Sequence, residues 1–189
     1  MVKRNASIFI SGTGTNLKSL IKNSKEYNFP IKINLIISNN KNALGLKLAR
    51  MHKIDYKVFD FNSRLQQEIL LKLLKKKKIQ LICLAGFMKV LSEKFINNFK
   101  GNIINIHPSL LPKYKGLNTF SRVLKSKDKF TGCTVHYVNK KLDSGKIILQ
   151  KKILISSRDN EKSLKFKTQL KEYKAYSEAI VKIYNNFSS

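Results

Sequence analysis

Asn105 and His107 are the residues whose types and spacing are best suited to chemistry. They lie two positions apart at the end of an apolar, β-branched segment, so their side chains leave the same face of a predicted strand. An amide donor beside an imidazole suits a carbonyl group that becomes an oxyanion, because Asn can donate to the oxygen and His can move a proton. The alternative is a capping Asn and a core His. Two polar side chains at the carboxyl end of a parallel strand favour the functional interpretation.

Asp143 and two further histidines are weaker candidates. Asp143 lies in the Gly-containing segment 141–145, where an Asp is usually a turn former. If it lies near His107, its charge should favour the imidazolium and raise the pKa of that histidine. Spacing alone does not establish such a contact. We interpret His136, which alternates with apolar residues in a predicted strand, as structural, and we assign no role to His52.

Residues 11–16, with the sequence SGTGTN, separate an apolar run from a helical pattern formed by Leu17, Leu20 and Ile21. Glycines let the backbone turn tightly, and the amides of a helix N-terminus favour an anion such as phosphate. The segment is not a phosphate-binding loop of the G-x-x-x-x-G-K-[ST] type. It is not a G-x-G-x-x-G motif either, because Leu17 stands at the third glycine position. A phosphate site and a purely structural turn both remain open.

The pattern of elements predicts a single α/β domain. Strands are expected at 7–10, 31–37, 56–59, 79–85 and 102–105, and they alternate with helices after residue 16, at 43–52, after an N-cap at Ser63 and at 92–98. Two further strands, at 131–138 and 146–155, precede an amphipathic helix at 161–187. Such alternation predicts a mostly parallel twisted sheet with helices on both faces, and ligands at the carboxyl ends of its strands.

The composition is globular, and its unusual feature is the charge. The chain has 189 residues, of which 42% are hydrophobic, and no apolar run approaches the length of a membrane helix or a signal peptide. We therefore expect a cytoplasmic protein with no membrane association. Cys83 and Cys133 lack metal or redox spacing, so we interpret them as buried free thiols.

The net charge of +27 would ordinarily suggest nucleic-acid binding, which is the alternative from a different functional class. However, 33 of the 38 basic residues are Lys, and they are scattered along a chain that is also rich in Asn and Ile. We interpret the charge as an effect of A/T-rich codons, with no specific nucleic-acid partner.

Four segments together resemble the phosphoribosylglycinamide formyltransferases, a branch of the folate-dependent formyltransferase family. They are ISGTGTNL, LAGFMKVLS, NIINIHPSLLPKYKG and GCTVHYVNKKLDSGKIILQ, and the similarity runs in register from about residue 6 to about residue 180. The resemblance implies a Rossmann-like domain over 1–189, with a phosphate-binding half at 1–100 and a catalytic and folate-binding half at 101–189. It implies transfer of the formyl group of 10-formyltetrahydrofolate to the amine of 5'-phosphoribosylglycinamide, in purine synthesis and without a metal.

The resemblance also implies roles for individual residues. Asn105 and protonated His107 would stabilise the oxyanion, His107 would donate a proton, and Asp143 would keep His107 charged. The glycinamide ribonucleotide contacts fall on Gly14, Thr15, Asn16, Gln169 and Glu172. The folate contacts fall on Arg64, Met88, Lys89, Val90, Leu91, Asn105, Asn139, Lys140, Lys141, Leu142 and Asp143.

Some residues depart from the family pattern, and some alternatives remain. Lys115 stands where a Pro is common, while Asn118 and Phe120 replace histidines of close relatives, which affects the expected order of the loop at 110–122. A formyltetrahydrofolate hydrolase or a methionyl-tRNA formyltransferase-like enzyme are the alternatives within the same fold. The partners expected are small-molecule substrates, and the protein is expected to be a monomer or a homodimer.

Overall fold

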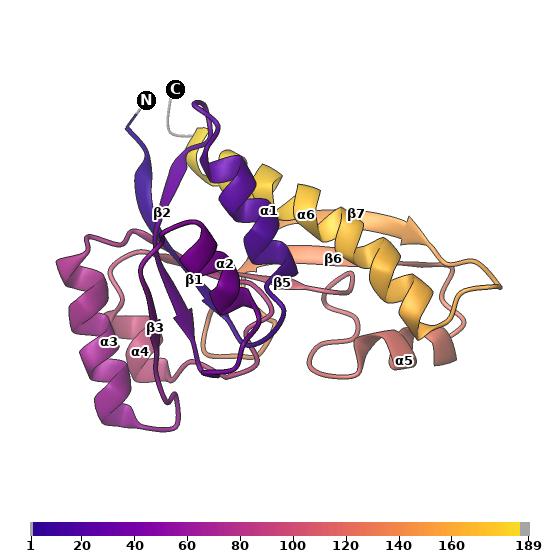
Figure 1. Cartoon of the computed structure of the whole chain (residues 1–189). Helices are drawn as coiled ribbons and strands as arrows, with labels where there is room; N and C mark the ends of the chain where they lie inside the picture. Colours follow the sequence, from indigo (N-terminus) through magenta and orange to yellow (C-terminus); the bar gives the residue numbers. More distant parts are fainter. Residues whose placement is uncertain (1, 186–189) are drawn as a thin grey trace. The chain divides into compact units, whose positions relative to one another are not determined.

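Strands and helices alternate through most of the chain, as the sequence predicts. The computed structural model describes residues 2–185 (Figure 1). Its strands are β1 (Arg4–Ile10), β2 (Ile31–Ser38), β3 (Tyr56–Val58), β4 (Leu81–Leu84), β5 (Asn102–His107), β6 (Phe130–Tyr137) and β7 (Ile147–Leu154). Its helices are α1 (Thr15–Ser24), α2 (Gly45–Met51), α3 (Arg64–Lys76), α4 (Glu93–Asn98), α5 (Thr119–Lys125) and α6 (Glu161–Asn185).

The strands form one seven-stranded sheet in the order β3-β2-β1-β4-β5-β6-β7. β1 pairs in parallel with β2 and β4, and β2 pairs in parallel with β3, whereas β6 and β7 are antiparallel. The predicted α/β fold with a mostly parallel sheet is confirmed. The chain divides into two compact units, which we call the N-terminal unit (Met1–Ile104) and the C-terminal unit (Asn105–Ser189).

The core of the N-terminal unit is built on β1 and β2. Ile8, Phe9 and Ile10 are fully buried, and β2 contributes further buried isoleucines, as expected for β-branched strands covered on both sides. The Phe9 ring meets Phe61 and Phe87 edge-to-face, with centroids 5.9 and 5.6 Å apart. This aromatic cluster fixes the loops that precede α3 and follow β4.

Helix α3 begins where the sequence predicts, but its buried face differs in part from the predicted apolar face. The Ser63 side chain accepts a hydrogen bond from the Gln66 amide, which confirms the predicted N-cap. Leu70 and Leu74 are buried, whereas Leu65, which belongs to the same apolar pattern, is 67% exposed. Gln67 takes a buried position instead because its amide group donates to the Phe61 carbonyl and its oxygen accepts from Ser92 Oγ.

In the C-terminal unit the long helix α6 packs against β6 and β7. Its buried face includes Leu164, Ala175, Tyr176 and Ala179. The predicted helix extends to residue 187, but its last two residues lie outside the described part of the chain. No helix within residues 2–185 has both the length and the apolar character that crossing a membrane requires.

Both cysteines are buried and free, as predicted. Burial raises the pKa of the Cys133 thiol to about 12, and the nearby charge of Glu172 adds to the effect. A thiol with so high a pKa is protonated at neutral pH, so Cys133 does not present a reactive thiolate.

Gly14 is the position in the glycine-rich turn where backbone geometry requires glycine. Its φ is +75°, and an added Cβ would lie 2.8 Å from Gly45 Cα, whereas a Cβ on Gly12 meets nothing within 4 Å. We expect Gly14→Ala to lower the free energy of unfolding by about 1–2 kcal/mol in denaturant titrations. Gly12→Ala is the matched control, with an expected change within about 0.5 kcal/mol. Equal effects of the two substitutions would contradict this account of the turn.

Candidate active site

Asp143 lies at the centre of a buried polar cluster in the C-terminal unit. Its side chain is 6% exposed. Oδ2 accepts a hydrogen bond from the Gly116 amide at 2.9 Å and lies 3.3 Å from His107 Nδ1. Oδ1 lies 3.5 Å from Asn105 Nδ2 and 3.6 Å from His136 Nε2. One carboxylate therefore contacts a main-chain donor, an amide and two imidazoles.

Three neighbouring elements bring these side chains together. Asn105 and His107 project from the same face of β5, as their spacing predicts, and His136 projects from β6. Asp143 lies in the turn between β6 and β7, with a left-handed φ of +46°. That turn needs glycine at Gly145, because an added Cβ would lie 1.7 Å from the Tyr137 carbonyl oxygen. The trio predicted from the sequence is thus brought into contact, although its catalytic roles remain a prediction.

Main-chain carbonyl groups determine which imidazole nitrogens bear protons. His107 Nε2 lies 2.8 Å from the Tyr114 carbonyl oxygen, and His136 Nδ1 lies 2.8 Å from the Tyr137 carbonyl oxygen. A carbonyl oxygen only accepts hydrogen bonds, so each of these nitrogens carries a proton. In the neutral form of each ring the other nitrogen, which faces Asp143, has a lone pair, and it donates to the carboxylate only when the ring is protonated. A proton taken up by His107 Nδ1 would therefore face the Asp143 carboxylate.

The pKa values of the cluster follow from burial and these contacts. Burial raises the pKa of Asp143, but the hydrogen bonds from His136 and Gly116 and the charge of His107 outweigh it and leave that pKa lowered. Burial lowers the pKa of His107, and the Tyr114 carbonyl and the Asp143 charge oppose burial without cancelling it. The expected effect of Asp143, which is to raise the pKa of His107, is present, but desolvation of the ring exceeds it and leaves the net pKa lowered.

Sequence reasoning missed His136 and the loop at 114–116. His136 is buried like a structural histidine, but its Nε2 lies 3.4 Å from Asn105 Nδ2 as well as near Asp143. The alternation around it in the strand identified a buried position without revealing what it faces. The Gly116 amide and the Tyr114 carbonyl carry no side-chain signal that a sequence could reveal.

The loop that contains Lys115 and Asn118 is held by several contacts. Lys115 Nζ donates to Ser144 Oγ at 2.5 Å, which joins the loop to the turn of Asp143. Arg122 donates to the Lys115 carbonyl at 2.6 Å, and Asn118 adopts a left-handed conformation before α5. Phe120 is partly buried at the start of that helix. Lys115 thus forms a specific contact with the turn of Asp143.

In the N-terminal unit the predicted phosphate loop begins α1. Gly14 is the N-cap of this ten-residue helix, no side chain caps it, and its first turn contains no acidic residue. Asn16 is buried. The loop also meets the segment after β4, because the Ser11 amide donates to the Gly86 carbonyl and the Ser11 hydroxyl accepts from the Met88 amide. An uncapped helix N-terminus with no nearby carboxylate suits an anion.

The predicted folate residues of the N-terminal unit lie on two adjoining segments. Met88 and Val90 are 70% and 72% exposed, while Leu91 is buried. Arg64 is exposed at the first position of α3. Lys89 Nζ lies 3.4 Å from Asn62 Oδ1, which places the segment 88–91 beside the start of α3. The structure brings these two segments together and leaves their side chains accessible.

The predicted ligand residues of the C-terminal unit lie on the turn of Asp143 and on α6. Asn139, Lys140, Lys141 and Leu142 are exposed, in contrast to the buried Asp143. Gln169 and Glu172 are half-buried on α6, and the charge of Glu172 reaches Cys133 on β6. Within residues 2–185 no three His, Cys, Asp or Glu side chains are arranged to hold a metal ion.

Comparison with known proteins identifies the family. The formyl transferase family model matches residues 4–180, which is nearly the whole chain. The chain belongs to the formyl transferase family. It is 41% identical over 174 residues to phosphoribosylglycinamide formyltransferase of Haemophilus influenzae, a match that covers 90% of this chain and 82% of that protein.

Other members of the family extend this similarity. The human trifunctional purine biosynthetic protein adenosine-3 is 36% identical over 182 residues, and this chain spans 18% of its length. Among solved structures, phosphoribosylglycinamide formyltransferase of Brucella melitensis gives a TM-score of 0.90 at 36% identity, and the match covers 97% of this chain and 96% of that one. The enzyme of the same name from Anaplasma phagocytophilum gives a TM-score of 0.89 at 36% identity, covering 95% and 85%.

The contact between His107 and Asp143 predicts how the pKa of His107 changes when the charge of Asp143 is removed. Because the Asp143 charge raises the pKa of His107, we expect Asp143→Asn to shift the midpoint of His107 further below 6.5. Histidine NMR signals followed against pH measure this midpoint. His52 lies in the N-terminal unit, so its NMR signals serve as the internal reference for the measurement. A His107 midpoint that rises in the variant would show that the carboxylate does not act on this ring.

Proposed function

We propose that this chain transfers the formyl group of 10-formyltetrahydrofolate to the amine of 5'-phosphoribosylglycinamide. The observation that supports the proposal most directly is the contact of Asn105, His107 and Asp143 in a member of the formyl transferase family. The relatives named phosphoribosylglycinamide formyltransferase support the choice of substrate. The step belongs to purine biosynthesis in those relatives that are named for that process.

In the proposed mechanism the substrate amine attacks the formyl carbon. A carbon–nitrogen bond forms, and the formyl oxygen becomes an oxyanion that accepts a hydrogen bond from Asn105 Nδ2. His107 Nδ1 takes the proton that the attacking nitrogen loses, and the resulting imidazolium faces the Asp143 carboxylate. His107 then donates this proton to N10 of the folate as the carbon–N10 bond breaks, which regenerates the carbonyl group and releases tetrahydrofolate.

The lowered pKa of His107 supports this two-way role. Burial makes the imidazolium a stronger acid, so it gives up its proton readily to the departing nitrogen. The Asp143 charge limits the cost of forming that imidazolium in a buried site. Asp143 also remains ionised at neutral pH, because its own pKa is lowered. The proposed role of protonated His107 therefore belongs to the reaction intermediate rather than to the resting protein.

Ligand-binding roles are proposed for residues of both units. Gly14, Thr15 and Asn16 bind the substrate phosphate through the N-terminus of α1. Gln169 and Glu172 contact the glycinamide side, where a carboxylate attracts the amine. Arg64 binds the negatively charged tail of the folate. Residues 88–91, Asn105 and residues 139–143 contact the rest of that co-substrate.

We also propose that the protein acts in the cytoplasm, as a monomer or a homodimer. Two buried free thiols are consistent with a reducing compartment. Oligomeric state would be measured by sedimentation and does not alter the proposed reaction.

A spectroscopic assay of tetrahydrofolate product tests the proposed reaction. We expect product only when both 5'-phosphoribosylglycinamide and 10-formyltetrahydrofolate are present. Product that forms without the ribonucleotide would contradict the proposal and indicate a hydrolase. Product that forms only with an aminoacylated tRNA would equally contradict it and indicate a different formyl acceptor.

Asn105→Ala tests the proposed donor to the oxyanion. We expect kcat to fall on the order of 10²–10³-fold, the usual effect of removing one such donor. Asn139→Ala is the matched control, because Asn139 is exposed and its side-chain oxygen accepts from the neighbouring Lys141 amide. For that variant we expect a change in KM with little change in kcat. If Asn105→Ala changes only KM, Asn105 contributes to binding and not to the chemical step, which would contradict the proposed role.

A further inference from the structure

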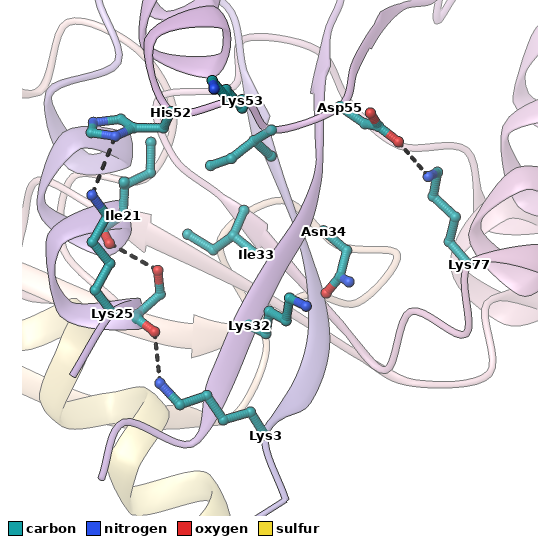
Figure 2. A pocket seen from close by; sticks show the side chains of 12 residues that line it. Lys3, Ile21, Lys25, Lys32, Ile33, Asn34, His52, Lys53, Asp55 and Lys77 are labelled. Carbon is teal, nitrogen blue, oxygen red and sulfur yellow. Dashed lines mark hydrogen bonds and ion pairs between the residues drawn. The ribbon is translucent and has the colours of Figure 1, made fainter. Parts of the chain in front are cut away.

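The N-terminal unit contains a pocket of about 720 Å³ that the proposed reaction does not use (Figure 2). Its walls come from the end of α1, the start of β2, and the segments that lead into β3 and β4. These are the amino ends of parallel strands, whereas residues 11–16 follow the carboxyl end of β1. The seven residues of β1 separate the two regions by roughly 20 Å at about 3.3 Å per residue.

The pocket lining has a large excess of positive charge. Lysines are the commonest lining residues, and they come from five separate places in the sequence: Lys3, Lys25, Lys32, Lys53 and Lys77. The only carboxylate in the lining is Asp55, so five ammonium groups against one carboxylate leave a formal excess of four charges. His52 adds none while its Nδ1 accepts from the Lys25 ammonium group, 3.4 Å away.

Two of these lysines are not used by the fold. Lys3 donates to the Ser24 carbonyl at 2.8 Å, and Lys77 pairs with Asp55 at 2.6 Å, so both have structural partners. The side-chain ammonium groups of Lys32 and Lys53 have no hydrogen-bond or ion-pair partner among residues 2–185. Free lysine side chains on a pocket wall are well suited to phosphate, which they contact as mobile point charges.

The pocket also has an apolar part and an unsatisfied polar atom. Ile21, Ile33 and Ile54 line it alongside the lysines. Figure 2 shows Asn34 beside Lys32, both on β2. The Asn34 amide oxygen is buried and has no hydrogen-bond partner in the described part of the chain. A buried polar atom of this kind is normally completed by an ordered water molecule.

We propose that this pocket binds a nucleoside triphosphate, with its phosphates on the lysines and its base against Ile54. The formal excess of four positive charges equals the charge of a fully ionised triphosphate. The volume lies within the 300–1,000 Å³ that is typical of small-molecule sites. Ile21 and Ile33 are 2% and 7% exposed, so the half-buried Ile54 is the isoleucine that a base can contact, and inorganic triphosphate has no apolar group to place there. The inference does not depend on the proposed formyl transfer.

Calorimetric titration with ATP at about 0.15 M salt tests this inference. Lys32→Gln/Lys53→Gln removes the two free pocket charges, and Lys76→Gln/Lys100→Gln removes two exposed charges outside the pocket. We expect one ATP per chain, and an affinity about tenfold or more lower in the pocket variant only. Because the two variants have the same net charge, general attraction to a protein of charge +27 affects them equally.

The results that would overturn the inference are equally specific. Equal weakening in both variants would mean that ATP binds through overall charge alone. Full affinity in the pocket variant, or no shift of the His52 NMR signals on adding ATP, would place the nucleotide elsewhere. If tripolyphosphate binds as tightly as ATP, the base makes no favourable contact with the apolar lining, and the proposal of a nucleotide is wrong. All four lysines are exposed, and wild-type circular dichroism of both variants would establish that they fold.

Discussion

The buried carboxylate of Asp143 is the constraint on which the candidate site depends. An ionised carboxylate is costly to bury unless donors surround it. Here a main-chain amide and an Asn side chain donate to it, and two imidazole rings that can take up a proton lie within 3.6 Å. The left-handed backbone at Asp143 and the glycine at Gly145 bring the carboxylate inside the unit. The same contacts orient His107, fix the loop at Gly116 and leave Asn105 beside them. One carboxylate therefore holds together the side chains to which the proposed chemical step is assigned.

The strands and helices were well predicted from the sequence, whereas the electrostatics of the candidate site were predicted only in part. β-branched runs and helical spacing located the strands and helices, and the two-residue spacing of Asn105 and His107 predicted their common face. The net pKa shift of His107 was not predictable, because it depends on how burial and a carboxylate 3.3 Å away balance. The exposure of Leu65 on α3 was missed for a similar reason, since Gln67 satisfies its amide in a buried position that an apolar pattern does not reveal.

The lysines that give the chain its net charge of +27 differ in their surroundings. Most lysines are exposed and scattered, which agrees with an effect of codon composition. Some have structural partners, such as Lys115 with Ser144 and Lys113 with Asp128. Those around the pocket at the amino ends of the strands are different, because several converge on one space with a single carboxylate among them. The positions of the lysines, rather than their number, distinguish the proposed binding surface from the solvated surface.

The most direct test of the central claim is the turnover of Asp143→Asn with saturating substrates. Asn keeps an oxygen that can accept from the Gly116 amide, so the turn should remain folded while the charge is lost. The account predicts that kcat falls by roughly 10²–10⁴-fold, the usual range for lost acid–base function, with a wild-type unfolding midpoint. A kcat close to that of the wild type in this folded variant would contradict the account, because the charge of Asp143 would then contribute nothing to the reaction.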